Sequence, residues 1–219
     1  MNISSSEVSY WLSRLQLGIP SQKRYLRYQM HNLIWEAFPG LPRGTKQPFL
    51  FSILDPDQRD SILCLVQSKL KPDLSAIGRQ ETINEIRLKS SESKQINLQI
   101  HKGDHYFYQL NTCPMKNINI GKSRRGIKVP LYNSIGVGKW LERRAKENGF
   151  LPIQHEYFIE KILVRSKSEV NSKDIMLAVC KYTAGIQVEN AHKFTDSLIK
   201  GIGSKKIFGF GMPMISPAV

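Results

Sequence analysis

The chain has 219 residues, with 32 lysines and arginines against 18 aspartates and glutamates, so its formal net charge is +14. A sequence pI of about 9.8 indicates a partner rich in phosphate, such as nucleic acid, although ribosomal or anionic-membrane surfaces would explain the same charge. Hydrophobic residues make up 41% of the chain, enough for one large core or two small ones. No apolar run is long enough to span a membrane, so no transmembrane helix is expected.

The N-terminus and the cysteines predict a cytoplasmic protein. Met1 to Ser9 is polar and lacks the apolar segment of a signal peptide. Cys64, Cys113 and Cys180 are odd in number and lie in or beside apolar runs, as reduced core cysteines do. Because the histidines and cysteines show no metal-ligand spacing, we predict neither a bound metal nor a cofactor.

The first half of the chain predicts the element order β-α-β-β-α-β. Residues 11–18 alternate apolar and polar positions, as a half-buried strand does. Pro20-Ser21 opens a helix in which apolar residues recur at helical spacing until Pro39-Gly40 ends it. Two strands, a weaker helix and a closing strand follow, and we expect them at 49–54, 62–70, 74–86 and 96–100.

The second half repeats that order. A strand is expected at 106–110, followed by a long basic loop. We then expect a helix at 137–148, strands at 158–165 and 175–188, a helix at 191–200 and a closing strand at 210–215. The repeated order predicts an α+β fold of two tandem ferredoxin-like (βαββαβ, RRM-like) domains. Residues 1–102 would form the N-terminal domain and residues 103–219 the C-terminal domain.

The sheets lack the aromatic signature with which RNA-recognition modules stack bases. Tyr106, Phe107 and Tyr108 are the nearest candidates, and core packing explains at least one of them. We therefore expect any bound RNA to be held through charge.

The first predicted helix carries four polar residues on one face. Arg24, Arg27, Tyr28 and His31 are spaced i, i+3, i+4 and i+7, opposite the apolar residues. An imidazole can transfer a proton at neutral pH, a phenol can orient a group, and two arginines can hold a phosphate. This set is sufficient to cut RNA through attack by its own 2′-hydroxyl. Taken alone, however, the helix favours a solvated basic face with an incidental histidine.

Positive charge is also concentrated later in the chain. Between Lys116 and Lys146 there are nine basic residues and one acid, whereas a solvated face usually mixes both signs. The segment from Gly201 to Gly211 holds four glycines and the adjacent Lys205 and Lys206. It could cradle a phosphate chain with exposed N–H groups, or it could be a helix stop followed by a glycine-rich turn.

Several short motifs occur in one order from Trp11 to Pro217, and together they resemble the CasE (Cse3) family, the repeat-cleaving endoribonucleases of type I-E CRISPR systems. The motifs are Tyr28-x-x-His31, Leu33, Trp35, Phe38-Pro39, Phe49 to Phe51, Leu65 to Ser68, Pro72-Asp73, Asn111-x-x-Pro114-x-Lys116, Lys128 to Leu131, Trp140-Leu141, Gly201 to Gly211 and Ser216-Pro217. The tail departs from the family pattern at Pro213, which would interrupt a strand ladder unless it lies on an edge strand.

The resemblance implies a metal-independent endoribonuclease that binds the CRISPR repeat hairpin and cuts at the 3′ base of its stem. It would leave a 2′,3′-cyclic phosphate and a 5′-hydroxyl, and then stay on the product as a subunit of the Cascade complex. The family's catalytic histidine falls on His31 and its helper tyrosine on Tyr28. The glycine-rich loop falls on Gly201 to Gly211, and a basic residue implicated in RNA contact falls on Arg165.

Our leading hypothesis assigns catalysis to His31, as general acid or base, and to Tyr28. The residues expected to bind RNA are Arg24, Arg27, Lys116, Lys122, Arg124, Arg125, Lys128, Arg165, Gly201, Gly203, Lys205, Lys206, Gly209 and Gly211. One alternative is a non-cleaving RNA-binding subunit of the same fold. Another is a ribosome-associated or DNA-binding module.

Overall fold

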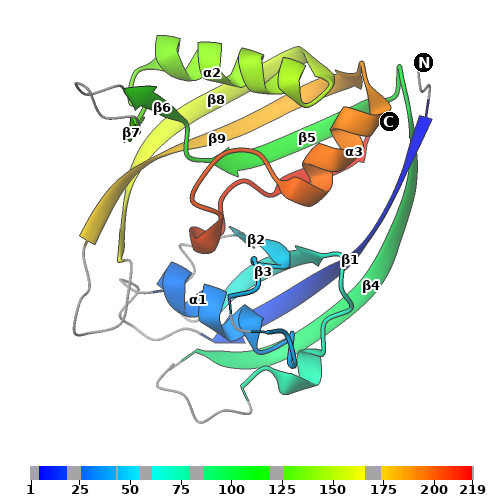
Figure 1. The fold of residues 1–219 in the computed structure, drawn as a ribbon, viewed down its shortest axis with the longest axis vertical. Helices are drawn as coiled ribbons and strands as arrows, with labels where there is room; N and C mark the ends of the chain where they lie inside the picture. The colour runs from blue at the N-terminus through cyan, green and yellow to red at the C-terminus, as the bar shows by residue number, and fades with distance from the viewer. Residues whose placement is uncertain are drawn as a thin grey trace.

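The computed structural model describes residues 5–18, 26–42, 44–54, 61–78, 86–118, 126–165 and 174–218. Two four-stranded antiparallel sheets form its frame, the first built from residues 5–101 and the second from residues 105–217 (Figure 1). No helix in these ranges is both long enough and apolar enough to cross a membrane.

The first sheet has the order β2-β3-β1-β4. Its strands are β1 (Ser5–Gly18), β2 (Phe49–Leu54), β3 (Ser61–Ser68) and β4 (Arg87–His101). Helix α1 (Leu26–Trp35) covers one face. Its buried residues Leu26, Met30, Leu33 and Ile34 recur at helical spacing, which is why the apolar stripe predicted this helix.

The expected second helix of this domain does not form over residues 74–78. The structure has one 3-10 turn there, η2 (Leu74–Ala76). Ile77 is already extended and Gly78 takes a φ of +79°, which ends the turn. The prediction of a helix from Leu74 is therefore wrong at its start, and residues 79–85 lie outside the described part of the chain.

The second sheet has the order β10-β5-β9-β8. Its strands are β5 (His105–Thr112), β8 (Phe150–Arg165), β9 (Asp174–Val188) and β10 (Pro213–Pro217). Two helices belong to the same half of the chain, α2 (Ser134–Glu147) and α3 (Ala191–Lys200). Numbered along each half, the strands of both sheets run 4-1-3-2. The prediction of two ferredoxin-like units is confirmed. We propose that the domains divide near Lys102-Gly103, where Gly103 takes a φ of +97° in the turn between β4 and β5.

Three details differ from the expectations or sharpen them. The long basic loop contains a hairpin of two short strands, β6 (Met115–Ile118) and β7 (Ile127–Pro130). Strand β8 begins earlier than expected, and its pairing is irregular between Pro152 and Gln154, opposite Gly185. Pro213 opens β10, which among the described strands pairs with β5 alone, so the proline lies on an edge strand.

The two sheets share a core, and the glycine-rich segment from Gly201 to Gly211 lies between them (Figure 1). Val8, Tyr10 and Ile100 of the first sheet pack into the cluster of the second. The side chain of Gln67 donates to the carbonyl of Leu198 at 2.6 Å in this buried seam. The seam fixes helix α1 relative to the glycine-rich segment, which contains the 3-10 turn η3 (Lys206–Phe208).

The cysteines belong to these cores. Cys64, Cys113 and Cys180 are all free and buried. Burial raises the pKa of the Cys113 and Cys180 thiols to about 12, so they stay protonated at neutral pH. The prediction that they are reduced core residues is confirmed.

Candidate active site and nucleic-acid interface

His31 lies on α1, half-buried, with both ring nitrogens near a side-chain partner. The indole Nε1–H of Trp35, one turn further along the helix, donates to Nε2 of His31 at 3.2 Å. Nδ1 lies 3.4 Å from Oδ1 of Asn32. Because an indole can only donate, Nε2 must accept, and the ring proton must be on Nδ1, where it can be donated to Asn32. The surroundings therefore select one neutral tautomer.

Aromatic rings surround the imidazole. The Tyr28 ring is stacked with its centroid 6.1 Å away, and the Phe49 ring lies at 5.8 Å. Burial lowers the pKa of His31 below its ordinary value of 6.5, because the charged form loses hydration. The neutral imidazole is thus the main form at pH 7 and can accept a proton.

Tyr28 and His31 are brought together as the sequence predicted, since they are three residues apart on one helix. Tyr28 is half-buried and also packs against a third apolar cluster that includes Phe208 and Phe210. The tyrosine therefore joins the histidine to the glycine-rich segment.

Arg27 lies on the same side of α1, but its charge is directed into the protein. Its Nη1 donates to the carbonyl of Phe208 at 3.0 Å, and its guanidinium lies 4.5 Å from the ring centroid of Phe210. Burial lowers its pKa. In this structure Arg27 fastens the glycine-rich segment to the helix, and Arg24 lies outside the described residues.

The glycines of the segment allow it to pack closely against both domains. A side chain at Gly209 would bring its Cβ within 2.6 Å of the Phe51 ring, and one at Gly203 would collide with Oγ1 of Thr112. Both glycines also take positive φ, as Gly201 and Gly211 do. The need for glycine here comes from packing as well as from the turn.

Several N–H groups of the segment are used within the protein. Ile202 N–H donates to Gly211 O at 2.8 Å, and Gly211 N–H donates to Asn111 O at 2.6 Å. The amides of Gly201 and Gly209 donate to earlier carbonyls in the same way. These four amides are therefore not free to bind a phosphate, and the positive charge comes from Lys205 and Lys206.

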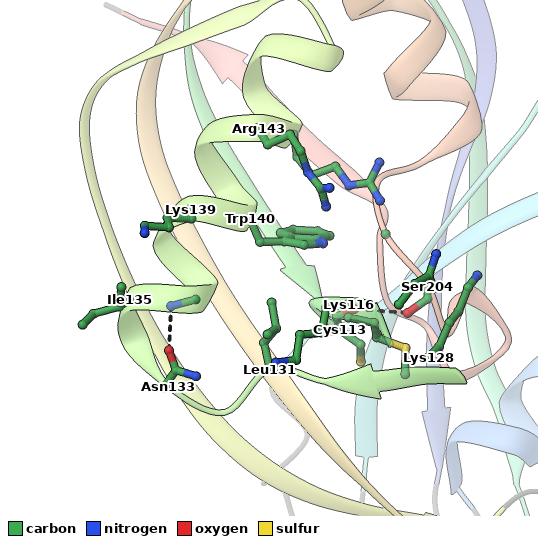
Figure 2. Close-up of a pocket in the computed structure, with 15 residues that line it drawn as sticks. Cys113, Lys116, Lys128, Leu131, Asn133, Ile135, Lys139, Trp140, Arg143 and Ser204 are labelled. Carbon is green, nitrogen blue, oxygen red and sulfur yellow. Dashed lines mark hydrogen bonds between the residues drawn. The ribbon is translucent and has the colours of Figure 1, made fainter. Parts of the chain in front are cut away.

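A basic groove of about 850 Å³ lies between the β6–β7 hairpin, helix α2 and the glycine-rich segment (Figure 2). Among the described residues, five cations and no carboxylate line it: Lys116, Lys128, Lys139, Arg143 and Arg144. Glu147, further along α2, pairs with Arg143 at 3.8 Å and with Arg144 at 2.7 Å. Figure 2 shows Lys116 and Lys128 beside Ser204, whose hydroxyl donates to the carbonyl of Cys113 at 3.1 Å. The structure thus assembles cations that are distant in sequence on one concave surface.

Helix α2 supplies the other wall of the groove. Asn133 caps it by accepting from the Gly136 N–H at 2.7 Å. Trp140 is 4% exposed, and its buried indole N–H has no hydrogen-bond partner in the described part of the chain. Lys139 and Arg143 were counted in the basic run but not selected as binding residues. Their i, i+4 spacing places them on one helix face and could have identified them.

Arg165 is not among the described residues that line this groove. Arg165 forms an ion pair with Asp174 at 2.6 Å, at the end of the β8–β9 pair remote from Phe150. Lys122, Arg124 and Arg125 lie outside the described residues.

Comparisons with known proteins give a matching family model and similar overall folds. The family model for "CRISPR associated protein" matches residues 10–217. The fold is similar to that of Cas6e from Escherichia coli K-12, with a TM-score of 0.71 at 20% identity over 95% of this chain and 100% of that one. It is also similar to Thermus thermophilus Cse3 bound to an RNA representing a pre-cleavage complex, with a TM-score of 0.72 at 21% identity over 96% and 100%. A CRISPR endoribonuclease Cse3 bound to a 19-nucleotide RNA matches with a TM-score of 0.74 at 20% identity, over 96% and 100%. A search of curated proteins found no match.

Proposed function

The chain belongs to the family of CRISPR-associated proteins, and from this premise we propose that it is an endoribonuclease that cuts the CRISPR repeat hairpin in precursor RNA without a metal ion. The observation that carries the proposal is the His31 imidazole, held neutral with Nε2 as the accepting atom. Tyr28 stacks beside it. A neutral imidazole is the form required to remove a proton from a ribose hydroxyl at neutral pH.

In the proposed reaction His31 acts first as a general base. Its Nε2 takes the proton of the 2′-hydroxyl after the RNA displaces the Trp35 N–H. The 2′-oxygen attacks the adjacent phosphorus, and the bond from phosphorus to the 5′-oxygen breaks. The departing oxygen receives a proton, which the imidazolium can return, so the products are a 2′,3′-cyclic phosphate and a 5′-hydroxyl. Tyr28 would orient the hydroxyl or the phosphate.

The basic groove would bind the stem of the hairpin. Duplex RNA has a deep, narrow major groove that hides its base edges, so shape and phosphate contacts should dominate recognition. The five cations that line it suit that role. Lys122, Arg124 and Arg125 of the hairpin loop, together with Arg24, would add further contacts. Binding should therefore weaken steeply as salt concentration rises.

The glycine-rich segment would hold the RNA between the stem site and His31. In this proposal Lys205 and Lys206 contact phosphates, whereas the glycines keep the segment close to Phe51 and Thr112. Arg27 anchors the segment to α1. After cleavage the protein would remain on the stem and join the other Cascade subunits in the cytoplasm. A CRISPR RNA-guided surveillance complex contains a chain of similar fold, with a TM-score of 0.61 at 18% identity.

The test is cleavage of an end-labelled repeat hairpin by the wild-type protein in excess EDTA. We expect one cut at the 3′ base of the stem and a product that resists 3′-end ligation until its cyclic phosphate is removed. Repeat hairpin should outcompete a scrambled RNA and a duplex DNA of equal length. Tight binding without any cut would support the alternative of a non-cleaving subunit. Equal competition by the scrambled RNA or the DNA would contradict both the endoribonuclease hypothesis and the non-cleaving subunit hypothesis.

A further inference from the structure

A second pocket of about 470 Å³, here called the interdomain pocket, lies between the first sheet and helix α3. Strands β2 and β3 line one side, and the glycine-rich segment with the end of α3 lines the other. The pocket is separate from the basic groove. Gly203 and Ser204 face the groove, whereas Lys206 and Ile207 face the interdomain pocket.

The polar part of this pocket is positively charged. Among the described residues, Lys46, Lys69, Lys200 and Lys206 line it, and no carboxylate does. Lys200 is paired with Asp196 at 2.6 Å, and Lys69 also helps to lower the pKa of that carboxyl, whereas Lys46 and Lys206 have no ion-pair partner among the described residues. Burial and the neighbouring charges of Lys46 and Arg144 lower the pKa of Lys206, whose Nζ donates to the carbonyl of Lys200, so the cations here repel one another. An anion would relieve this repulsion.

The other part of the pocket is apolar. Leu70 is 46% exposed and Ile207 is 37% exposed, and the buried Phe49 and Leu50 also belong to the lining. An inorganic ion would not cover the exposed apolar side chains of Leu70 and Ile207. A nucleotide has both an anionic phosphate, which the lysines can bind, and a flat base, which can cover the apolar side chains. Proteins that bind single-stranded nucleic acid also combine a basic groove with nonpolar contacts to the bases, there made by aromatic rings.

The pocket adjoins the proposed catalytic residue. Gln47 and Phe49 are among its lining residues; the Gln47 side chain is a hydrogen-bond partner of His31, and the Phe49 ring lies 5.8 Å from the His31 ring, centroid to centroid. An RNA whose scissile phosphate lies at His31 would have its stem in the basic groove on one side of the glycine-rich segment. The nucleotide bonded to the other side of that phosphate would be next to the interdomain pocket.

We propose that the interdomain pocket binds the single-stranded nucleotide on the 3′ side of the cut, with its phosphate against the lysines and its base against Leu70 and Ile207. This inference rests on the proposed function. It adds a site for the leaving strand that is distinct from the site for the stem.

The experiment measures the affinity of hairpins made uncleavable by a 2′-deoxynucleotide at the cut. One ends at the cut, a second carries three extra nucleotides on the 3′ side, a third carries them on the 5′ side, and a fourth has an abasic 3′ flank. We expect the 3′ flank to tighten binding to wild type by on the order of tenfold, and the abasic flank to lose most of that gain. The Lys46→Ala/Lys69→Ala double variant should bind all four hairpins within about twofold of one another. Both lysines are exposed, so the variant should fold.

The matched control is Lys89→Ala/Lys94→Ala, which removes the same charge from exposed positions on β4 that line neither site. It should keep the wild-type preference for the 3′ flank. The proposal is overturned if the 3′ flank adds nothing in wild type, if the 5′ flank alone adds affinity, or if the abasic flank binds as tightly as the normal one. It is also overturned if the Lys46/Lys69 variant keeps the preference. Failure of every hairpin to bind would instead refute the proposed function on which this site depends.

Discussion

The indole N–H of Trp35 donates to Nε2 of His31 at 3.2 Å, from one turn further along the same helix. This contact fixes the histidine in the tautomer that carries its proton on Nδ1. It also opposes protonation, since an imidazolium would place two N–H donors against each other. The relationship makes Trp35 a positioning residue whose effect can be measured without RNA.

Replacing Trp35 with phenylalanine should raise the pKa of His31 and allow the neutral imidazole to adopt both tautomers. Phenylalanine keeps a ring beside Phe49 but cannot donate a hydrogen bond. An NMR titration of the imidazole nitrogens measures both quantities in the free protein. Trp11→Phe, on β1, is the control and should leave His31 unchanged. An unaltered tautomer in Trp35→Phe would show that the indole does not set it.

Cleavage should depend on a deprotonated His31. Because burial lowers the pKa of His31 below 6.5, the base form persists as the pH falls through 6.5 and is lost only below the lowered pKa. The single-turnover rate should therefore fall on the acid side with an apparent pKa under 6.5. A rate that rises on acidification would assign His31 the role of acid in the rate-limiting step.

The same pKa shift links His31 to stability. The unfolded state binds a proton near pH 6.5 and the folded state only at lower pH, so this residue destabilises the fold as pH drops below 6.5 and has no such effect above it. The free energy of unfolding of His31→Gln, relative to that of wild type, should therefore be higher at pH 5.5 than at pH 7.5. Urea unfolding at the two pH values measures this difference. An unchanged difference would show that His31 titrates alike in both states.

Replacing Arg27 with lysine should loosen the glycine-rich segment. The change removes the guanidinium contacts to the Phe208 carbonyl and the Phe210 ring, and we expect a loss of about 1–3 kcal/mol in the free energy of unfolding. Hydrogen exchange in residues 201–211 should accelerate. The control is Arg143→Lys, at an exposed position on α2. Equal exchange in both variants would contradict the anchoring role.

Gly209→Ala tests whether the segment needs glycine for packing. Gly209 and Gly40 both take positive φ, but a Cβ at Gly40 meets nothing within 4 Å, whereas one at Gly209 meets Phe51 at 2.6 Å. We expect Gly40→Ala to cost about 1 kcal/mol from backbone strain alone. Gly209→Ala should cost about 2–4 kcal/mol, because the ring must also move. Denaturant unfolding compares them, and equal losses would rule out the packing explanation.

The groove on α2 predicts a salt effect. Lys139→Ala/Arg143→Ala should weaken binding of the uncleavable hairpin and reduce the slope of log affinity against log salt by about 1–2. Lys89→Ala/Lys94→Ala removes equal charge from β4 and should keep the wild-type slope. Equal slopes in the two variants would mean that the groove does not contact RNA phosphates.

Local patterns predicted the elements that bury a regular apolar stripe, and missed those that distant contacts determine. Leu26, Met30 and Leu33 identify α1 because their spacing matches a helix. Strands β6 and β7 have only four residues each and no clear alternation, so pairing with each other is what makes them strands.

The site shows the same division. Tyr28 and His31 are three residues apart, so their proximity follows from helix geometry. Arg27 was predicted on spacing alone to face a phosphate, but the chain brings Phe208 beside it and occupies its guanidinium. The glycines were visible in the sequence, whereas the Phe51 ring that requires Gly209 becomes evident only in the fold.

The central claim is that His31 performs the proton transfer, and single-turnover cleavage of the repeat hairpin in EDTA by wild type and His31→Ala tests it most directly. The account predicts that the variant binds the hairpin within about twofold of wild type but cuts it about 10²–10⁴ times more slowly. Cleavage by the variant at the wild-type rate would contradict the assignment of His31.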